Sequence, residues 1–311
     1  MKVNTLSRAV AEPADEPCRS GANVICVGVQ KCATSFIHSA MGTHPQAGIS
    51  APKELDFFSY FFDRGYSWYE KHFSACVALP VRFEASPSYF YDPRSPERIR
   101  GYRPEMKIIV LLRDPVERAY SNHLHEVIQG HIGAVPFEEG LANNPGYIDQ
   151  GRYATHLRRW FSQFERDSIL VMFAEEISAD PIGAAQKVYA FSGLDAEHVS
   201  PVLLERRNES DRARLPALRA VLRAGGDKLR DLGLEDQLAR VKAAGPVQRL
   251  LAANSQNMRG IVPPMNEATR ARLTEVFEEE LLALPELLRR ESLPWATYER
   301  LCGLPAASGI G

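Results

Sequence analysis

The stretch "VICVGVQKCATSFIHSAM" (residues 24–41) passes from a buried-strand pattern into a helical pattern within one short turn. The turn carries Gly28 and Lys31, and the hydroxyl residues Thr34 and Ser35 open the helix. A helix that follows a buried strand offers free backbone N–H groups and the positive end of its dipole to an anion. The stretch therefore predicts a phosphate-type binding loop. An ordinary strand–helix turn with a surface lysine would fit the same letters.

Three further runs have the composition of strands: "VRFEAS" (81–86), "KIIVLL" (107–112) and "SILVMF" (168–173). Nearly continuous apolar runs of this kind are typical of strands that are buried on both faces. Helical patterns at 116–128 and 153–164 lie between them. The alternation predicts an α/β fold with a parallel sheet and right-handed crossovers.

The two ends of the chain differ from this alternating centre. Residues 1–22 lack an apolar signal core and are expected to form a flexible polar leader, followed by one domain over 23–311. The segment 200–260 is charged, broken by glycines and without a visible strand pattern, which predicts a helical insertion on that domain. Asn266 is the expected N-cap of a later helix with an apolar stripe over 273–284.

Composition excludes several classes of function. The 311 residues carry a net charge of −2, so no overall basic field favours nucleic acid. No apolar run approaches the roughly 20 residues of a membrane helix. The five cysteines show no metal-binding spacing and favour a reducing compartment. These features predict a cytoplasmic protein that binds neither nucleic acid nor membrane and holds no metal. They leave the oligomeric state open.

A second stretch, "KIIVLLRDPVERAYSNHLHEV" (107–127), repeats the strand-to-helix pattern. Arg113 follows the carboxyl end of its strand, where open α/β sheets place ligands. On the predicted helix, Arg118, Ser121 and His125 are spaced to share one face. The stretch predicts a second half of an anion site, although a local ion pair between Arg113 and the next aspartate would also explain the arginine.

Together the two stretches resemble those of PAPS-dependent sulfotransferases, whose donor is 3'-phosphoadenosine 5'-phosphosulfate (PAPS). The 5'-phosphosulfate loop of that family usually reads Pro-Lys-Ser/Thr-Gly-Thr-Thr, and "QKCATS" (30–35) stands here. The family's 3'-phosphate segment is a strand, an arginine and a later helix serine, which Arg113 and Ser121 match. Four further pieces resemble the heparan-sulfate-type branch in order: "KELDFFS" (53–59), "GYSWYEKHF" (65–73), "EASPSYFYD" (84–92) and "GRYATHLRRWFSQF" (151–164). The likeness extends over roughly residues 24–195.

The resemblance implies a P-loop-like, three-layer α/β/α fold with a central parallel sheet, to which the chain adds its helical C-terminal excursion. It also implies transfer of a sulfuryl group from PAPS to a hydroxyl, or to an amine, without a metal. The expected acceptor is a small molecule such as a sugar or a secondary metabolite, whose identity the sequence does not reveal.

The resemblance assigns roles to individual residues as well. Lys31 is expected to neutralise the bridging oxygen of the leaving phosphate, as a catalytic and a donor-binding residue. Glu54 in "KELDFF" is the expected catalytic base, and His125 is an expected acid/base or acceptor-positioning group. The remaining predicted donor-binding residues are Cys32, Ala33, Thr34 and Ser35 of the loop, Arg113 and Ser121 at the 3'-phosphate, and Arg212 from a late basic loop. Arg214 and Arg259 are alternatives to Arg212.

The sequence departs from the family pattern at two positions, so two alternative functions remain open. Ala33 replaces the loop glycine, and Ala85 stands where the O-sulfotransferases of the branch have a lysine. A degenerate module that binds a nucleotide without turnover would tolerate both changes. A P-loop kinase is the other rival, but it requires a Gly-Lys-Ser/Thr run, which is absent, and a metal-binding aspartate, for which only Asp114 is a loose match.

Overall fold

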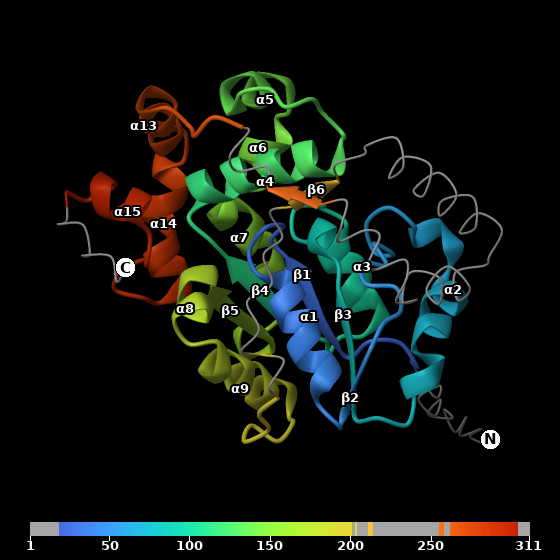
Figure 1. Cartoon of the computed structure of the whole chain (residues 1–311). Coiled ribbons are helices and arrows are strands. Elements are labelled where there is room, and N and C mark those ends of the chain that lie inside the picture. The colour runs from blue at the N-terminus through green and yellow to red at the C-terminus, as the bar shows by residue number, and fades with distance from the viewer. Residues whose placement is uncertain (1–18, 201–202, 204–210, 214–254, 258–261, 304–311) are drawn as a thin grey trace, which may run out of the picture.

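A computed structural model describes residues 19–200, 203, 211–213, 255–257 and 262–303 (Figure 1). Its centre is a five-stranded sheet in the order β2-β3-β1-β4-β5, in which all neighbours are parallel. The strands are β1 (Val24–Gly28), β2 (Ala47–Ile49), β3 (Val81–Ala85), β4 (Lys107–Leu112) and β5 (Ile169–Phe173). The four predicted strands are confirmed. The edge strand β2 was not predicted, because three residues are too short to show a period.

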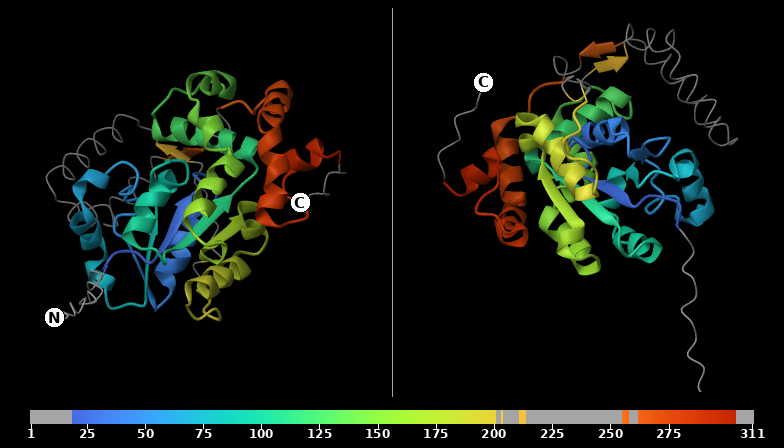
Figure 2. Two further views of the ribbon diagram at one scale, coloured as in Figure 1. Left: turned by 180° about the vertical axis from the view of Figure 1, so that it is seen from behind. Right: turned by 90° about the horizontal axis from the view of Figure 1, so that it is seen from below.

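Helices cover both faces of this sheet, which confirms the three-layer fold class. On one face, α1 (Thr34–Thr43) packs beside α9 (Pro181–Ser192). On the opposite face, α3 (Ser95–Tyr102) packs beside α7 (Tyr153–Gln163), as the view from behind shows (Figure 2). Every residue of β1 is buried between these layers, as the continuous apolar run predicted.

Helix α4 (Pro115–Gln129) begins where the second stretch predicted a helix. Pro115 occupies the first turn, and Asp114 is the N-cap, accepting hydrogen bonds from two backbone N–H groups of that turn. Asp114 also accepts from the backbone N–H of Thr297 at 3.0 Å and from its hydroxyl at 2.8 Å. The aspartate therefore caps helix starts rather than forming the alternative ion pair with Arg113.

The C-terminal helices are α13 (Glu267–Val276), α14 (Glu278–Leu288) and α15 (Ala296–Leu301). Asn266 is the N-cap of α13, since its side-chain oxygen accepts from the N–H of Thr269 at 2.7 Å, which confirms that prediction. The apolar stripe, however, continues across a break between α13 and α14 at Phe277, whose φ and ψ are −97° and 1°. Helix α14 packs against α7 and so joins this segment to the sheet.

Short elements complete the described part. The helices are α2 (Tyr66–Glu70), α5 (Phe137–Asn143), α6 (Gly146–Asp149) and α8 (Ala174–Ala179), and the 3-10 turns are η1 (Phe62–Arg64), η2 (Lys71–Cys76), η3 (Pro87–Tyr89) and η4 (Arg166–Ser168). No helix among the described residues combines the length and the apolar character that a membrane crossing requires.

The segment 200–260 differs from the expectation that it holds no strand. Its described part includes β6 (Asp211–Ala213) and β7 (Ser255–Asn257), which pair antiparallel, and β6 packs against α4. Strands of three residues again carry no readable period. The rest of the predicted helical insertion, with Arg214 and Arg259, lies outside the described residues, as do residues 1–18 of the predicted leader. The last residues of that leader are packed, since the N–H of Gly21 donates to the Tyr102 hydroxyl at 2.9 Å.

Candidate active site

The carboxyl ends of β3, β1 and β4 meet at one edge of the sheet, because the three strands are parallel neighbours. Residues 29–33 follow β1, Ser86 follows β3 and Arg113 follows β4. Arg113 donates from Nη1 to the carbonyl oxygen of Lys31 at 3.5 Å. The two stretches that predicted an anion site therefore lie in contact.

The loop between β1 and α1 presents backbone donors. Lys31 and Ala33 have left-handed φ values of 69° and 67°, and Ala33 is the N-cap of α1 without any side-chain cap. Within the described ranges, the N–H groups of Ala33, Thr34 and Ser35 donate to no protein acceptor. Uncapped N–H groups at a helix start, beside a lysine, are the donor set that a phosphate or sulfate oxygen requires. The loop therefore has the donors that an anion would require, and its role stays a prediction.

The left-handed Ala33 leads to a test of stability. Its side chain makes this conformation cost about 1–2 kcal/mol, whereas glycine adopts it freely and loses only part of the gain through chain entropy. Ala33→Gly is expected to raise the free energy of unfolding by roughly 0.5–1 kcal/mol in urea denaturation. Ala40→Gly, inside α1, is the control and is expected to destabilise. Equal destabilisation by both variants would contradict this account of the loop.

Cys32 lies in the loop but is fully buried, and its thiol contacts the carbonyl oxygen of Gln30 at 3.7 Å. Burial raises the pKa of Cys32 to about 12. A thiol that stays protonated is a poor nucleophile. Cys32 therefore contributes its place in the backbone, as expected, rather than covalent chemistry.

Lys53 joins the donor loop to the predicted base, and sequence reasoning did not assign it a role. Its Nζ donates to the hydroxyl oxygen of Ser35 at 3.0 Å and forms an ion pair with Oε1 of Glu54, also at 3.0 Å. The side chains of Lys53 and Glu54 are 26% and 46% exposed. The signal was the position of Lys53 directly before Glu54 in "KELDFFS". The structure thus brings Lys31, Ser35, Arg113 and Glu54 around one loop.

The turn that carries Glu54 is held at the end of β3. Glu54 and Asp56 have left-handed φ values of 63° and 52°. The N–H of Asp56 donates to the hydroxyl oxygen of Ser86 at 3.0 Å, and the Asp56 carboxylate accepts from the Ser88 hydroxyl at 2.5 Å. Leu55 is buried beside them. The Glu54 side chain is therefore presented at the surface by a turn whose neighbours are anchored.

Glu84, the last polar residue of β3, is a fully buried carboxyl group. Ser86 and Tyr89 each donate a hydroxyl hydrogen to its Oε1 at 2.6 Å, and Tyr69 donates to Oε2 at 2.7 Å. Burial raises the pKa of Glu84 to about 7, against the lowering effect of these hydrogen bonds. The strand pattern around Glu84 did not predict that its carboxyl would be buried among three hydroxyl donors.

This pKa predicts how stability depends on pH. The ordinary glutamate pKa is 4.5, so between pH 4.5 and about 7 the folded chain holds a proton that the unfolded chain has lost. The free energy of unfolding therefore falls as the pH rises through this window, by about 3 kcal/mol in total. Glu84→Gln is expected to lack this fall, which chemical denaturation of both proteins from about pH 4 to about pH 8 measures. Parallel curves for the two proteins would contradict it.

The remaining predicted residues lie on or near α4. Ser121 and His125 are half-buried on this helix, and Ser121 is six residues, or about 9 Å of helix axis, after Pro115. Arg118 is fully buried and donates to the carbonyl of Tyr147 and to the side chain of Gln150, so it supports α6 rather than sharing a ligand face with them.

For Arg212, the predicted late donor-binding arginine, the structure describes only the strand in which it lies. Arg212 lies in β6, which packs against α4, but its side chain is outside what the structure describes. His123 is buried against the carbonyl of Val135 at 2.9 Å, so it points away from His125, as expected. Across the described residues, no group of three or more His, Cys, Asp and Glu side chains could hold a metal ion.

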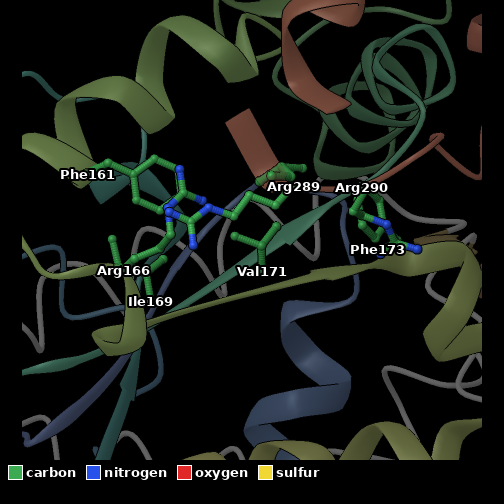
Figure 3. Close-up of a pocket in the computed structure, with 8 residues that line it drawn as sticks. Phe161, Arg166, Ile169, Val171, Phe173, Arg289 and Arg290 are labelled. Carbon is green, nitrogen blue, oxygen red and sulfur yellow. The ribbon is translucent and has the colours of Figure 1, made fainter. Parts of the chain in front are cut away.

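A surface recess lies elsewhere, along the edge strand β5 (Figure 3). It encloses about 200 Å³ over alternate residues of one face of β5. Two of the three arginines that line it have partners within the protein: the guanidinium of Arg166 lies 4.2 Å from the ring centre of Phe161, and Arg290 pairs with Glu176 at 2.6 Å. Strand β4 separates β5 from β1, so this recess is not where the predicted site residues gather.

Comparison with known proteins gives relatives that are similar to this chain in sequence. Heparan sulfate glucosamine 3-O-sulfotransferase 6 of Mus musculus is 31% identical over 181 residues, which cover 55% of this chain and 52% of that protein. Bifunctional heparan sulfate N-deacetylase/N-sulfotransferase 1 of Mus musculus is 26% identical over 201 residues, covering 58% of this chain and 23% of that protein. The chain thus spans about half the length, or less, of these curated relatives.

A solved structure and a family model agree with these relatives. The crystal structure of a sulfotransferase from Alicyclobacillus acidocaldarius matches with a TM-score of 0.64 and 21% identity, over 87% of this chain and 96% of that chain, which shows a shared fold. The family model described as "Sulfotransferase domain" matches residues 22–214, more than half of the 311 residues, and this range includes the loop at Lys31, Glu54 and Arg113. The chain therefore belongs to the sulfotransferase domain family.

Proposed function

We propose that this protein transfers a sulfuryl group from PAPS to a hydroxyl group, or to an amine, of a small acceptor such as a sugar or a secondary metabolite. The observation that carries the proposal is the uncapped start of α1, where Arg113 contacts the loop at Lys31 and the Lys53–Glu54 pair contacts the helix at Ser35. A donor with two anionic ends and an acceptor beside it fit this arrangement.

The donor-binding residues divide between the two ends of the donor. The N–H groups of Ala33, Thr34 and Ser35, with the Lys31 ammonium, would bind the 5'-phosphosulfate. Arg113 and Ser121 would bind the 3'-phosphate that distinguishes PAPS from ATP, because a guanidinium and a hydroxyl are both donors to phosphate oxygens. Arg212 is the proposed late arginine, since β6 packs against the helix that carries Ser121.

The bound donor would supply the sulfuryl group, and the protein would position it and stabilise charge. Lys31 neutralises the negative charge that grows on the phosphate as the bond to sulfur breaks. Glu54 accepts the proton of the acceptor hydroxyl, for which its exposed carboxylate is accessible. Lys53 contacts both Ser35 and Glu54, where its ammonium can favour the anionic sulfuryl oxygens. His125 is the proposed acceptor-positioning group.

The size and charge of the acceptor are proposed from this chain's own residues. The names of the two curated relatives refer to heparan sulfate, and one of them also names glucosamine. Ala85 removes the lysine that the O-sulfotransferases of that branch carry, and the net charge of −2 gives no general attraction for a polyanion. We therefore expect a small, weakly charged acceptor. Transfer of labelled sulfate from PAPS to glucosamine, to simple phenols and to heparan sulfate compares these classes.

Calorimetric titration tests the donor assignment directly. The protein is expected to bind 3',5'-ADP, the desulfated donor product, but not ATP with magnesium. Arg113→Ala is expected to abolish this binding, whereas Arg272→Ala, an exposed arginine on α13, serves as the control and is expected to retain it. Binding of Mg-ATP alone would overturn the proposal in favour of a kinase. Binding of neither would overturn the donor site.

The structure weighs against the kinase rival. Asp114 was the loose match to a metal-binding aspartate, yet both of its carboxylate oxygens accept hydrogen bonds from protein donors. The degenerate module predicts a different result: binding of 3',5'-ADP without transfer to any acceptor class. Titration and labelled transfer together separate the three functions.

A further inference from the structure

The carboxyl of Glu84 forms no ion pair within the described part of the chain, although it is fully buried. The carboxyl instead accepts hydrogen bonds from three hydroxyl groups. A serine hydroxyl has one hydrogen, and that of Ser86 is directed to Glu84 Oε1 at 2.6 Å. The lone pairs of the Ser86 oxygen are then left to accept, and they receive the N–H of Asp56 at 3.0 Å.

This second hydrogen bond reaches the turn that carries Glu54. Glu54 and Asp56 both have left-handed φ values, a conformation that costs free energy for residues other than glycine and that its surroundings must maintain. On the other side of the turn, the Asp56 carbonyl accepts from the Ser59 hydroxyl at 3.1 Å. The Ser86 oxygen, one residue after β3, therefore accepts from the backbone two residues after Glu54, and Ser88 holds the side chain of the same aspartate.

We propose that Glu84 and Ser86 are positioning residues for the Glu54 carboxylate: Glu84 fixes the orientation of the Ser86 hydroxyl, and Ser86 holds the 54–56 turn. The inference rests on the proposed function, in which Glu54 is the base. Its consequence is that the reaction depends on a buried carboxyl that touches neither donor nor acceptor. A shift of about 1 Å in a reacting group lowers rates by about 100-fold, so loss of this contact has a large effect.

Two variants that each remove one hydroxyl from the same carboxyl test this role. Ser86→Ala removes the donor that also contacts Asp56, whereas Tyr69→Phe removes only the hydroxyl that donates to the other oxygen. Phenylalanine keeps the ring that packs against Phe57 and Phe58, so this variant is a matched control. Hydrogen exchange of the segment 54–59 is measured by mass spectrometry. Turnover is followed as release of 3',5'-ADP from PAPS with glucosamine as the probe acceptor.

Ser86→Ala is expected to speed exchange in 54–59 and to lower kcat by roughly 10- to 100-fold, while the KM for PAPS and the affinity for 3',5'-ADP stay unchanged. Tyr69→Phe is expected to lower the melting temperature but to leave exchange in 54–59 and kcat at their wild-type values. Equal effects of the two variants on exchange would overturn the proposal, because Ser86 would then act only through general stability. If the wild-type protein neither binds 3',5'-ADP nor turns over PAPS, the proposed function fails, and the exchange comparison alone still decides the role of Ser86.

Discussion

Glu54→Gln is expected to lower kcat for sulfuryl transfer by roughly 10²- to 10⁴-fold, the usual contribution of a positioned general base. Glutamine keeps the length and shape of the side chain but cannot take a proton from the acceptor. The backbone of its turn is anchored at Asp56, so the turn does not depend on the charge of Glu54. Binding of 3',5'-ADP is expected to stay at the wild-type value, because among the described residues it is Lys53 that links Glu54 to the proposed donor loop.

Steady-state turnover and calorimetry of the same preparation measure both quantities. Glu97→Gln, an exposed glutamate on α3, is the matched control and is expected to retain full kcat. If Glu54→Gln keeps wild-type turnover, another group accepts the proton, and the assignment of the base is wrong. If Glu54→Gln loses affinity for 3',5'-ADP to the same degree as it loses turnover, then Glu54 maintains the conformation of the loop between β1 and α1 and is not the base.

Lys31→Met is expected to lower kcat by roughly 10²- to 10³-fold and to weaken binding of 3',5'-ADP as well. Methionine keeps an unbranched side chain of similar length and removes the charge that would neutralise the leaving phosphate. The two effects are expected to differ in size, because the negative charge on the phosphate grows during the reaction and the ammonium interacts with it most strongly there.

Lys187→Met, on the exposed side of α9, controls for loss of a lysine elsewhere and is expected to change neither quantity. Lys31→Arg is expected to recover part of the affinity, since a guanidinium also binds phosphate oxygens. Turnover of Lys31→Met at the wild-type rate would show that the backbone N–H groups of the loop suffice without the ammonium.

The strand, turn and helix of the proposed anion loop could be predicted because they are local. A buried strand requires a continuous apolar run, and a helix that starts after it leaves N–H groups free whatever the rest of the chain does. Residues 24–41 therefore carry their own structure, and so does the stretch from 107 to 127. The contact between Lys31 and Arg113 follows once the two strands are neighbours.

The acceptor side was harder to predict because its contacts join distant segments. Lys53 meets Ser35 only after the chain has passed through α1 and β2. Glu84 reads as an ordinary polar residue in a strand, and no local pattern shows that three hydroxyl groups will surround it. Arg118 has the right helical spacing to share a face with Ser121, but α6 covers it, and spacing alone does not show what packs against a helix.

The hydrogen bonds of Asp114 indicate which C-terminal residues the domain requires for its structure. The family match stops at residue 214, yet Thr297 donates twice to the aspartate that directly follows Arg113. Trp295 adds a second attachment through Glu175, whose other carboxylate oxygen accepts from the N–H of Asp114. A chain cut at residue 214 would leave Asp114 and Glu175 with unused acceptors beside Arg113. A transplant of the matched range alone is thus expected to distort the proposed donor site. A segment exchanged between relatives should therefore include residues 295–297.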